Sequence, residues 1–198
     1  MQLPKVENTL IKDWQKKQEI TKEKKQDILE NQVNFVYLAL GSNLGDKKNN
    51  LNKSIDLIQE EGIFIKKRSK FYITKSWPNE NFPNFINSII LVKTKLNIAE
   101  LFLKIKKIEK KLGRTKSKRN YPRICDIDII DFNGEIIHRK IGNYKLNTPH
   151  KRMHNRNFVL FPLFELNKDW VHPKLNKNIV ILMSNLTSDQ LLGIKIAQ

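Results

Sequence analysis

The chain contains one cysteine, Cys125, in 198 residues. A single cysteine excludes an internal disulfide and any zinc site built from several cysteines. No apolar run reaches the roughly 18 residues that a membrane-spanning helix requires, so we expect no membrane association. The N-terminus mixes lysine with acidic residues and lacks the apolar segment of a secretory signal. We therefore expect a cytoplasmic protein.

Several nucleotide-binding and hydrolytic motifs are also missing. Residues 41–47 read GSNLGDK, which has glycines and a lysine but not the order of a P-loop. No G-x-G-x-x-G occurs, so neither a Rossmann site nor a kinase glycine-rich loop is supported. The four histidines lack the spacing of a zinc protease, and nothing resembles a Ser-His-Asp site.

Acidic residues are scarce, with 20 against 37 basic residues and a formal net charge of +17. Only 7 of the basic residues are arginine, and lysine, asparagine and isoleucine are all abundant. This bias is typical of an AT-rich coding sequence, so the charge alone is a weak indicator of nucleic-acid binding. An arginine in such a chain suggests a need for its planar, bidentate guanidinium. Four of the seven lie in two segments considered below: Arg114, Arg119, Arg123 and Arg156.

The length predicts one domain with an appendage. Residues 1–32 are rich in lysine, glutamate and glutamine and carry only a broken apolar stripe. We expect a charged N-terminal extension there, disordered or loosely helical, and a single domain over residues 33–198. No further domain is visible after that core.

The apolar pattern of the domain alternates between strand and helix periods. It predicts strands at 35–40, 63–73, 85–96 and 124–132. It also predicts one helix with Leu51, Ile55 and Ile58 at helical spacing, ended by Gly62, and a second helix at 98–112. Asn97 and Glu100 form a capping-box pattern ahead of the second helix, and Gly113 ends it. The order β-α-β-β-α-β is typical of a ferredoxin-like α+β fold, an antiparallel sheet with helices on one face. Asn133-Gly134 suggests a hairpin that returns through 136–137, and the tail suggests one or two more helices.

The stretch from Gly113 to Ile130 holds the strongest chemical signal. Asp126 and Asp128 alternate with isoleucines on the last predicted strand, so both project from one face about 7 Å apart. Two carboxylates this close favour a cation between them, and Mg²⁺ is usually held by one or two carboxylates together with substrate phosphates. Five cationic side chains directly upstream are suited to gripping such phosphates: Arg114, Lys116, Lys118, Arg119 and Arg123. The alternative for the pair alone is a solvated face of an edge strand.

Five segments, taken together and in order, resemble the family of 6-hydroxymethyl-7,8-dihydropterin pyrophosphokinases, enzymes of folate biosynthesis. They are ALGSNLGD (39–46), FYITKSWPNENFPNFIN (71–87), IEKKLGR (108–114), RNYPRICDIDIIDFNG (119–134) and TPHKRMHNRNFVLFPLFEL (148–166). The resemblance covers roughly residues 34–173 and includes the patterns P-R-x-x-D-x-D and P-H-x-x-M-x-x-R-x-F. The ferredoxin-like core of the family agrees with the element order above.

The resemblance implies transfer of pyrophosphate as one unit from ATP, the co-substrate, to the hydroxymethyl group of the pterin, with release of AMP. Asp126 and Asp128 match the aspartates that hold two Mg²⁺ ions, and positioning with charge neutralisation carries most of such a reaction. The implied catalytic residues are Arg114, Arg123, Asp126 and Asp128. The implied ATP-binding residues are Glu109, Arg114, Lys116, Arg119, Arg123, Lys145, His150 and Arg156.

The resemblance also implies a pterin pocket. Phe85 and Phe158 match two aromatic residues that sandwich the ring, and Asn87 matches an amide that reads its hydrogen-bonding edge. The implied pterin-binding residues are Gly41, Ser42, Asn43, Leu44, Thr74, Phe85, Asn87 and Phe158. For the two phenylalanines, plain core packing is the alternative.

The loops at 74–84 and 114–123 match lids that close over the substrates and exclude water. Arg119→Ala is therefore expected to slow turnover or product release. Three positions depart from the family pattern. A common Thr-Pro-Pro run reads Thr74-Lys75-Ser76-Trp77, the tryptophan that often follows the lid arginine is replaced at Asn120-Tyr121, and Lys145 stands where some members have arginine.

Two other readings stay open at this point. A ferredoxin-like RNA-binding module accounts for the basic charge, but it lacks the aromatic-rich glycine motif and leaves the aspartate pair unexplained. A non-catalytic scaffold of the same family is disfavoured by the intact pair, Arg123 and His150. We expect a monomer that binds ATP and the pterin and has no nucleic-acid partner.

Overall fold

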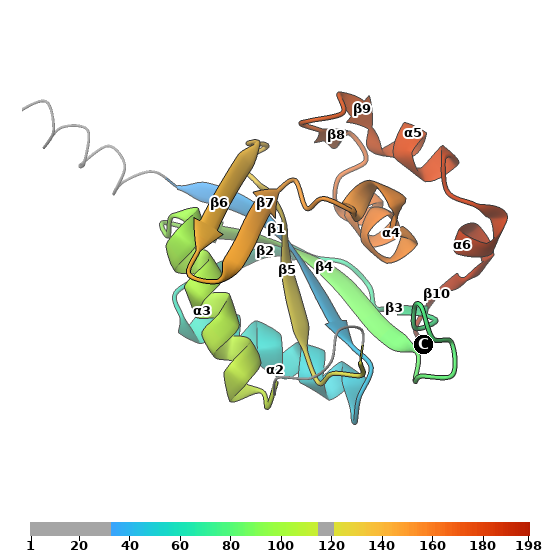
Figure 1. Ribbon diagram of the computed structural model, residues 1–198, viewed down its shortest axis with the longest axis horizontal. Helices are drawn as coiled ribbons and strands as arrows, with labels where there is room; N and C mark the ends of the chain where they lie inside the picture. Colours follow the sequence, from blue (N-terminus) through green and yellow to red (C-terminus); the bar gives the residue numbers. More distant parts are fainter. Residues whose placement is uncertain (1–32, 115–120) are drawn as a thin grey trace, which may run out of the picture. The chain divides into compact units, whose positions relative to one another are not determined.

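The structure is a computed structural model that describes residues 33–114 and 121–198 (Figure 1). It is an α+β fold, as predicted. The strands are β1 (Asn34–Ser42), β2 (Phe64–Arg68), β3 (Tyr72–Thr74), β4 (Phe85–Thr94), β5 (Asp126–Phe132), β6 (Ile137–Ile141), β7 (Tyr144–Thr148), β8 (Val171–His172), β9 (Lys177–Asn178) and β10 (Ile194–Ile196). The helices are α2 (Lys47–Glu60), α3 (Ile98–Lys111), the 3₁₀ turn η1 (Met153–Asn155), α4 (Asn157–Leu166), α5 (Ile179–Ser184) and α6 (Ser188–Leu192).

The main sheet has the ferredoxin-like strand order. β1 lies between β4 and β5 and is antiparallel to both, while β2 and β3 pair with the other edge of β4. The predicted strand at 63–73 is split into β2 and β3. Ser69 lies at the break, where its N–H donates to the Ile89 carbonyl and its Oγ accepts from the Ile89 N–H. A side chain therefore replaces one bond of the regular ladder.

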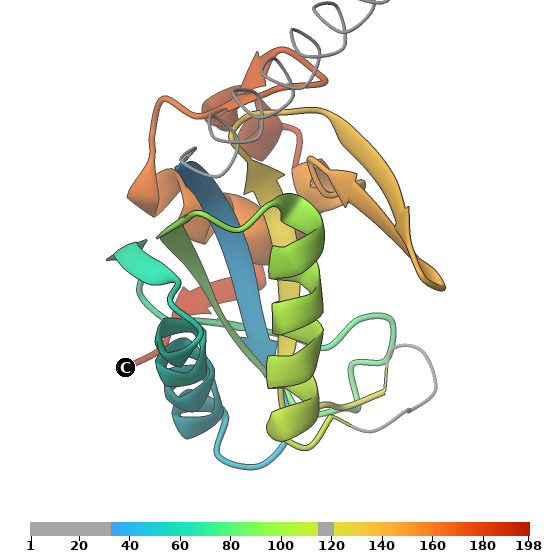
Figure 2. The same ribbon diagram turned by 90° about the vertical axis from the view of Figure 1, so that its left-hand side faces the viewer.

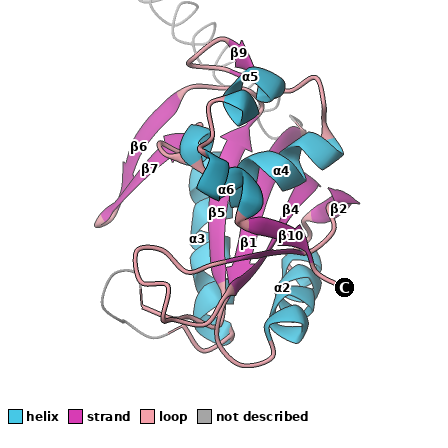
Figure 3. Ribbon diagram, turned by 90° about the vertical axis from the view of Figure 1, so that its right-hand side faces the viewer, coloured by secondary structure: helices cyan, strands magenta, loops and turns pink. Residues whose placement is uncertain are grey.

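Both faces of the sheet are covered, whereas helices were expected on one face. Figures 2 and 3 view the sheet from its two sides, with α2 and α3 over one face and α4 over the other. The reason lies in β1, where Val36 and Leu38 point into the core under α2 and α3 while Tyr37 and Ala39 face α4. A strand that is apolar on both sides requires a cover on both sides. The C-terminal residues supply it with α4, against which the shorter helix α5 packs.

Helix α3 begins and ends as its sequence predicts. The Asn97 side chain accepts from the N–H of Glu100, and the Glu100 carboxylate accepts from the Asn97 N–H, which completes the capping box. Gly113 follows the helix with φ of +90°, a backbone conformation that favours glycine. The sharp stop directs the chain towards the site described below.

The hairpin predicted at Asn133-Gly134 is wrong, although the turn itself is present. Both residues have positive φ, and the Glu135 N–H donates to the Phe132 carbonyl. The Asn133 side chain accepts from the N–H of Phe35, so the turn is tied to the start of β1. The chain then leaves β5, and β6 pairs with β7 in a separate two-stranded sheet. No helix in the described parts of the chain is long and apolar enough to cross a membrane.

Candidate active site

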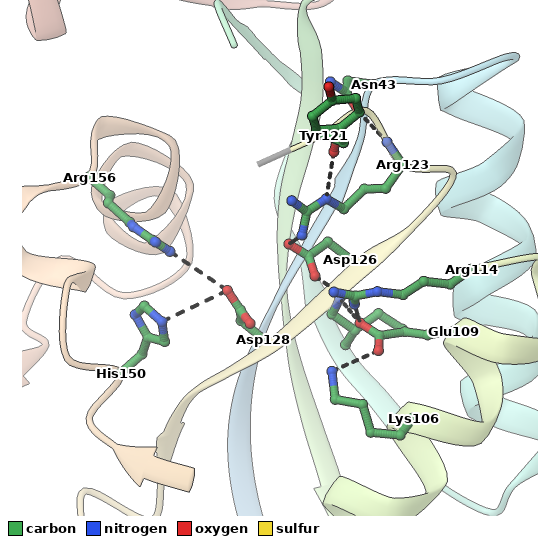
Figure 4. Close-up of polar contacts among 11 residues, drawn as sticks. Asn43, Lys106, Glu109, Arg114, Tyr121, Arg123, Asp126, Asp128, His150 and Arg156 are labelled. Atoms are coloured by element: carbon green, nitrogen blue, oxygen red, sulfur yellow. Dashed lines mark hydrogen bonds and ion pairs between the residues drawn. The ribbon is translucent and has the colours of Figure 1, made fainter. Parts of the chain in front are cut away.

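Asp126 and Asp128 lie on β5 and project from the face of the sheet that α4 covers (Figure 4). The intervening Ile127 points into the opposite core and is 1% exposed. Alternation along the strand therefore places both carboxylates on one side, as predicted. Their side chains keep 28% and 37% of their surface exposed, so both are open to a ligand.

Four cationic or titratable side chains from separate segments surround this pair. Asp126 accepts from Arg114 at 2.7 Å through Oδ1 and from Arg123 at 3.1 Å through Oδ2. The Oδ2 of Asp128 lies 3.6 Å from a guanidinium nitrogen of Arg156 and 4.0 Å from Nε2 of His150. The sequence-predicted residues at these positions are therefore brought together around the two aspartates.

Glu109 lies on α3 behind Arg114 and is 1% exposed. Its carboxylate accepts from Arg114, from Lys106 at 2.7 Å and from the backbone N–H of Ile127 at 2.8 Å. Burial raises the pKa of Glu109, and these three donors offset part of that effect. Glu109 thus ties α3 to β5 and fixes the guanidinium of Arg114. Lys106 was not predicted, although its i,i+3 spacing from Glu109 was visible in the sequence.

The pKa values of three other groups in the site, Arg114, His150 and Arg156, do not all shift in the same direction. Burial opposes the charged form of Arg114, but the attraction of Asp126 and Glu109 exceeds it and raises the pKa of Arg114. Burial lowers the pKa of His150, and the attraction of Asp128 offsets this only in part. His150 is therefore neutral at pH 7, so its imidazole contributes a hydrogen-bonding group and no formal charge. Burial also lowers the pKa of Arg156, which nevertheless stays charged at neutral pH.

The predicted pterin residues gather beside the pair, where β1, β3 and β4 meet. Gly41 lies opposite Asn87 in the β1–β4 register, and a Cβ at Gly41 would come within 3.3 Å of the Asn87 side-chain oxygen and 3.6 Å of the Phe85 ring. Asn87 donates to the Thr74 hydroxyl at 2.9 Å. Thr74 and Phe85 are partners in the β3–β4 register. Glycine at 41 thus lets the β1 backbone lie close to an amide and an aromatic ring, where a Cβ would be crowded.

The other predicted residues have varied positions. Ser42 is buried and accepts from Asn50, Leu44 is 45% exposed, and Asn43 is buried with every polar atom of its side chain engaged. Phe158 is half-buried in the first turn of α4, with the Arg156 guanidinium 5.3 Å from its ring centre. Lys145 is exposed on β7 and is not among the residues that contact Asp126 or Asp128 in the described structure. Lys116 and Arg119 lie outside the described residues.

Sequence reasoning missed the contacts made by Ser76 and Tyr121. The Ser76 hydroxyl accepts from Asn43, and the Tyr121 ring packs against Phe82 with centroids 5.5 Å apart. Both residues lie in segments that depart from the family pattern. These departures were the only feature of the sequence that could have pointed to the two contacts.

The ferredoxin-like sheet brings two partly exposed carboxylates together with three arginines, a set of charges suited to a phosphorylated ligand. The comparisons with known proteins specify it further. The family described as 7,8-dihydro-6-hydroxymethylpterin-pyrophosphokinase matches residues 37–168, and the chain belongs to this family.

Bacterial relatives are similar over most of their length. A 2-amino-4-hydroxy-6-hydroxymethyldihydropteridine pyrophosphokinase of Aquifex aeolicus is 41% identical over 142 residues, which is 72% of this chain and 86% of the relative. The protein of the same name from Bacillus subtilis is 40% identical over 134 residues, which is 67% of this chain and 78% of the relative.

Solved structures support the fold. Plasmodium falciparum HPPK-DHPS, crystallised as a variant with pterin and p-hydroxybenzoate, superposes with a TM-score of 0.68 at 17% identity. The match covers 84% of this chain and 48% of the Plasmodium chain, so this chain spans about half of that protein. At this identity the likeness shows the fold alone.

Proposed function

We propose that this chain transfers pyrophosphate from ATP to 6-hydroxymethyl-7,8-dihydropterin and releases AMP, a step of folate synthesis. The observation that carries the proposal is the acidic pair on β5, held between arginines from three segments and placed next to Gly41, Phe85 and Asn87. Family membership supports the same chemistry. An ATP site and a pterin site side by side are what a direct transfer requires.

Asp126 and Asp128 are the proposed ligands for Mg²⁺. In the described residues no three His, Cys, Asp or Glu side chains are grouped closely enough to form a complete metal site. Two carboxylates nevertheless fit Mg²⁺, because this ion keeps several waters and takes its other ligands from substrate phosphates. Bound there with ATP, as two ions, it would neutralise charge on the phosphates.

The arginines complete the neutralisation from the protein side. We assign Arg114 and Arg123 to the phosphates, and Glu109 holds Arg114 in place through a buried ion pair. When a ligand draws the Arg123 guanidinium away from Asp126, the Oδ2 of this aspartate would become free for the metal. Arg156 and neutral His150 border Asp128 and are assigned to further phosphate oxygens.

The pterin is assigned to the surface that Gly41, Phe85 and Asn87 form together. The Asn87 amide is suited to read the polar edge of the ring, because its orientation is fixed by Thr74. Phe85 from β4 and Phe158 from α4 supply apolar surface for stacking. Ser42 at the end of β1, and Asn43 and Leu44 in the turn that follows it, are assigned to the border of the same subsite.

We also propose that residues 33–198 form the catalytic domain, that residues 1–32 are a dispensable extension, and that the protein is a cytoplasmic monomer. Light scattering of the full chain tests the oligomeric state. Cell fractionation tests the location.

An assay that separates nucleotide products tests the proposed activity. With MgATP and the dihydropterin we expect pterin-dependent AMP without free pyrophosphate. Formation of ADP would show transfer of a single phosphate, and no product from folded protein would leave a scaffold role.

A further inference from the structure

Three segments that border the site are joined by hydrogen bonds through one buried residue, Asn43. Its Nδ2 donates to the Ser76 hydroxyl at 3.2 Å and to the Pro83 carbonyl at 3.3 Å. Its Oδ1 accepts from the backbone N–H of Arg123 at 2.8 Å, and its own N–H donates to the Arg123 carbonyl at 3.2 Å. Asn43 is 1% exposed, so water does not compete for these bonds.

Ser76 holds the side of this junction that belongs to the loop after β3. It is 3% exposed, and its hydroxyl donates to the Pro83 carbonyl at 2.7 Å while accepting from Asn43. The common family pattern has proline in the run that here reads Thr74-Lys75-Ser76-Trp77, and proline has no side-chain hydroxyl. Ser76 thus closes the loop 75–84, which we call the pterin loop, onto Asn43.

A second contact joins the same two segments nearer the surface. The Phe82 ring of the pterin loop lies 5.5 Å from the ring of Tyr121, with an angle of 52° between their planes. Arg123 Nε donates to the Tyr121 carbonyl at 3.3 Å, so the residue that touches the pterin loop also touches the arginine that pairs with Asp126. Tyr121 is part of the other departure from the family pattern.

We propose that Ser76 is a positioning residue that couples the pterin subsite to the phosphate subsite. The connection runs from Ser76 through Asn43 to the backbone of Arg123, whose guanidinium contacts Asp126. A nucleotide that reorients Arg123 therefore acts on the pterin loop, and a bound pterin acts on Arg123. Such coupling is reciprocal, since each ligand changes the affinity of the other by the same factor.

Binding of the two ligands, measured separately and together, tests this inference, which rests on the proposed function. The full chain is titrated calorimetrically with 6-hydroxymethyl-7,8-dihydropterin, with and without the magnesium complex of α,β-methylene-ATP. The methylene group replaces the oxygen that would leave with AMP, so binding is read without turnover. In the unsubstituted chain we expect the nucleotide analogue to tighten pterin binding by about tenfold or more.

Ser76→Ala is expected to reduce this coupling factor by about fivefold, the value of one typical hydrogen bond. Ser76→Thr keeps the hydroxyl and should retain the factor. Ser54→Ala is the matched control, because Ser54 is also buried and donates to a backbone carbonyl, but within α2. Phe82→Ala, which removes the ring contact with Tyr121, should lower the factor independently.

The outcomes separate the inference from the function. Failure of the unsubstituted chain to bind either ligand would overturn the proposed function and the coupling with it. Independent binding of both ligands, or a coupling factor unchanged in Ser76→Ala and Phe82→Ala, would overturn the coupling alone. An equal loss in Ser54→Ala would also overturn it, because the effect would then follow from general loosening.

Discussion

Among single residues, Asp128 has the more exposed carboxylate of the acidic pair on β5. We expect Asp128→Asn to lower kcat/KM by about 10² or more, because it removes one of the two charges assigned to the metal and its phosphates. The change is isosteric and the side chain is 37% exposed, so folding should be retained. Steady-state kinetics over a range of Mg²⁺ concentrations measures the effect.

Asp56→Asn provides a matched control, since Asp56 is exposed on α2. It should leave kcat/KM unchanged. Equal activities for Asp128→Asn and the unsubstituted chain would remove Asp128 from the site.

Glu109 gives the second prediction at this scale. Glu109→Gln keeps the shape but breaks a buried ion pair, leaving Arg114 and Lys106 without their shared carboxylate. We expect a loss of about 3 kcal/mol in the free energy of unfolding, measured in urea, together with lower activity. Glu60→Gln, at an exposed pair with Lys111, should change stability by less than about 0.5 kcal/mol. Similar losses in the two variants would contradict a special role for Glu109.

The sequence predicted which residues belong to the site better than it predicted which of them contact one another. Strand alternation alone placed Asp126 and Asp128 on one face. The contact of Arg156 with Asp128 joins residues 28 positions apart on different elements, so only the family resemblance, and no local pattern, linked them. Asn43 donates a hydrogen bond to Ser76, which lies 33 positions further along the chain, and nothing in the local sequence of either residue predicts that pairing.

At the scale of elements, local signals worked where the structure depends on local contacts. The capping box at Asn97 and the end of the helix at Gly113 could both be predicted from the sequence, and both are present. Because α3 carries Glu109, its N-terminal cap also supports the site. We expect Asn97→Ala to lower the free energy of unfolding by about 1 kcal/mol in urea denaturation. Asn49→Ala, at an exposed position inside the first turn of α2, should cause no comparable loss.

Elements whose partners lie far along the chain were predicted less well. The turn at Asn133-Gly134 has the backbone angles of a hairpin, yet its neighbour in space is the start of β1. Tertiary contacts therefore decided the strand pairing. The run at 35–40 was continuous in apolar residues, which is the pattern of a strand buried on both faces. A strand of this kind needs a covering layer on each face, and α4 forms the second layer.

For the whole molecule, His172 makes one contribution to the pH dependence of stability. This residue is 4% exposed, its Nδ1 accepts from the N–H groups of Lys174 and Leu175, and its ring lies near those of Trp170 and His154. Burial, with a contribution from His154, lowers the pKa of His172 from 6.5 to about 4. The folded state therefore resists protonation that the unfolded state accepts.

Stability should fall as the pH drops from about 6.5 to about 4, at about 1.4 kcal/mol per pH unit for this one group. His172→Asn retains a side-chain acceptor but does not titrate. Urea unfolding at several pH values should show a shallower dependence for this variant over that window. Parallel curves for the two proteins would contradict the assignment.

Deleting residues 1–32 tests the proposed division of the chain. The family match begins at residue 37, so the shortened protein should keep kcat and both KM values within about twofold. A large loss of activity would assign the segment to the domain.

The proposed activity requires attack at the β-phosphorus of ATP. We would test this with ATP that carries ¹⁸O in the bridge between the α- and β-phosphorus atoms, with products followed by ³¹P NMR. Attack at the β-phosphorus breaks its bond to this oxygen, so we expect ¹⁸O in AMP and an unlabelled diphosphate ester of the pterin. Labelled ADP with a pterin monophosphate, or labelled free pyrophosphate, would contradict it.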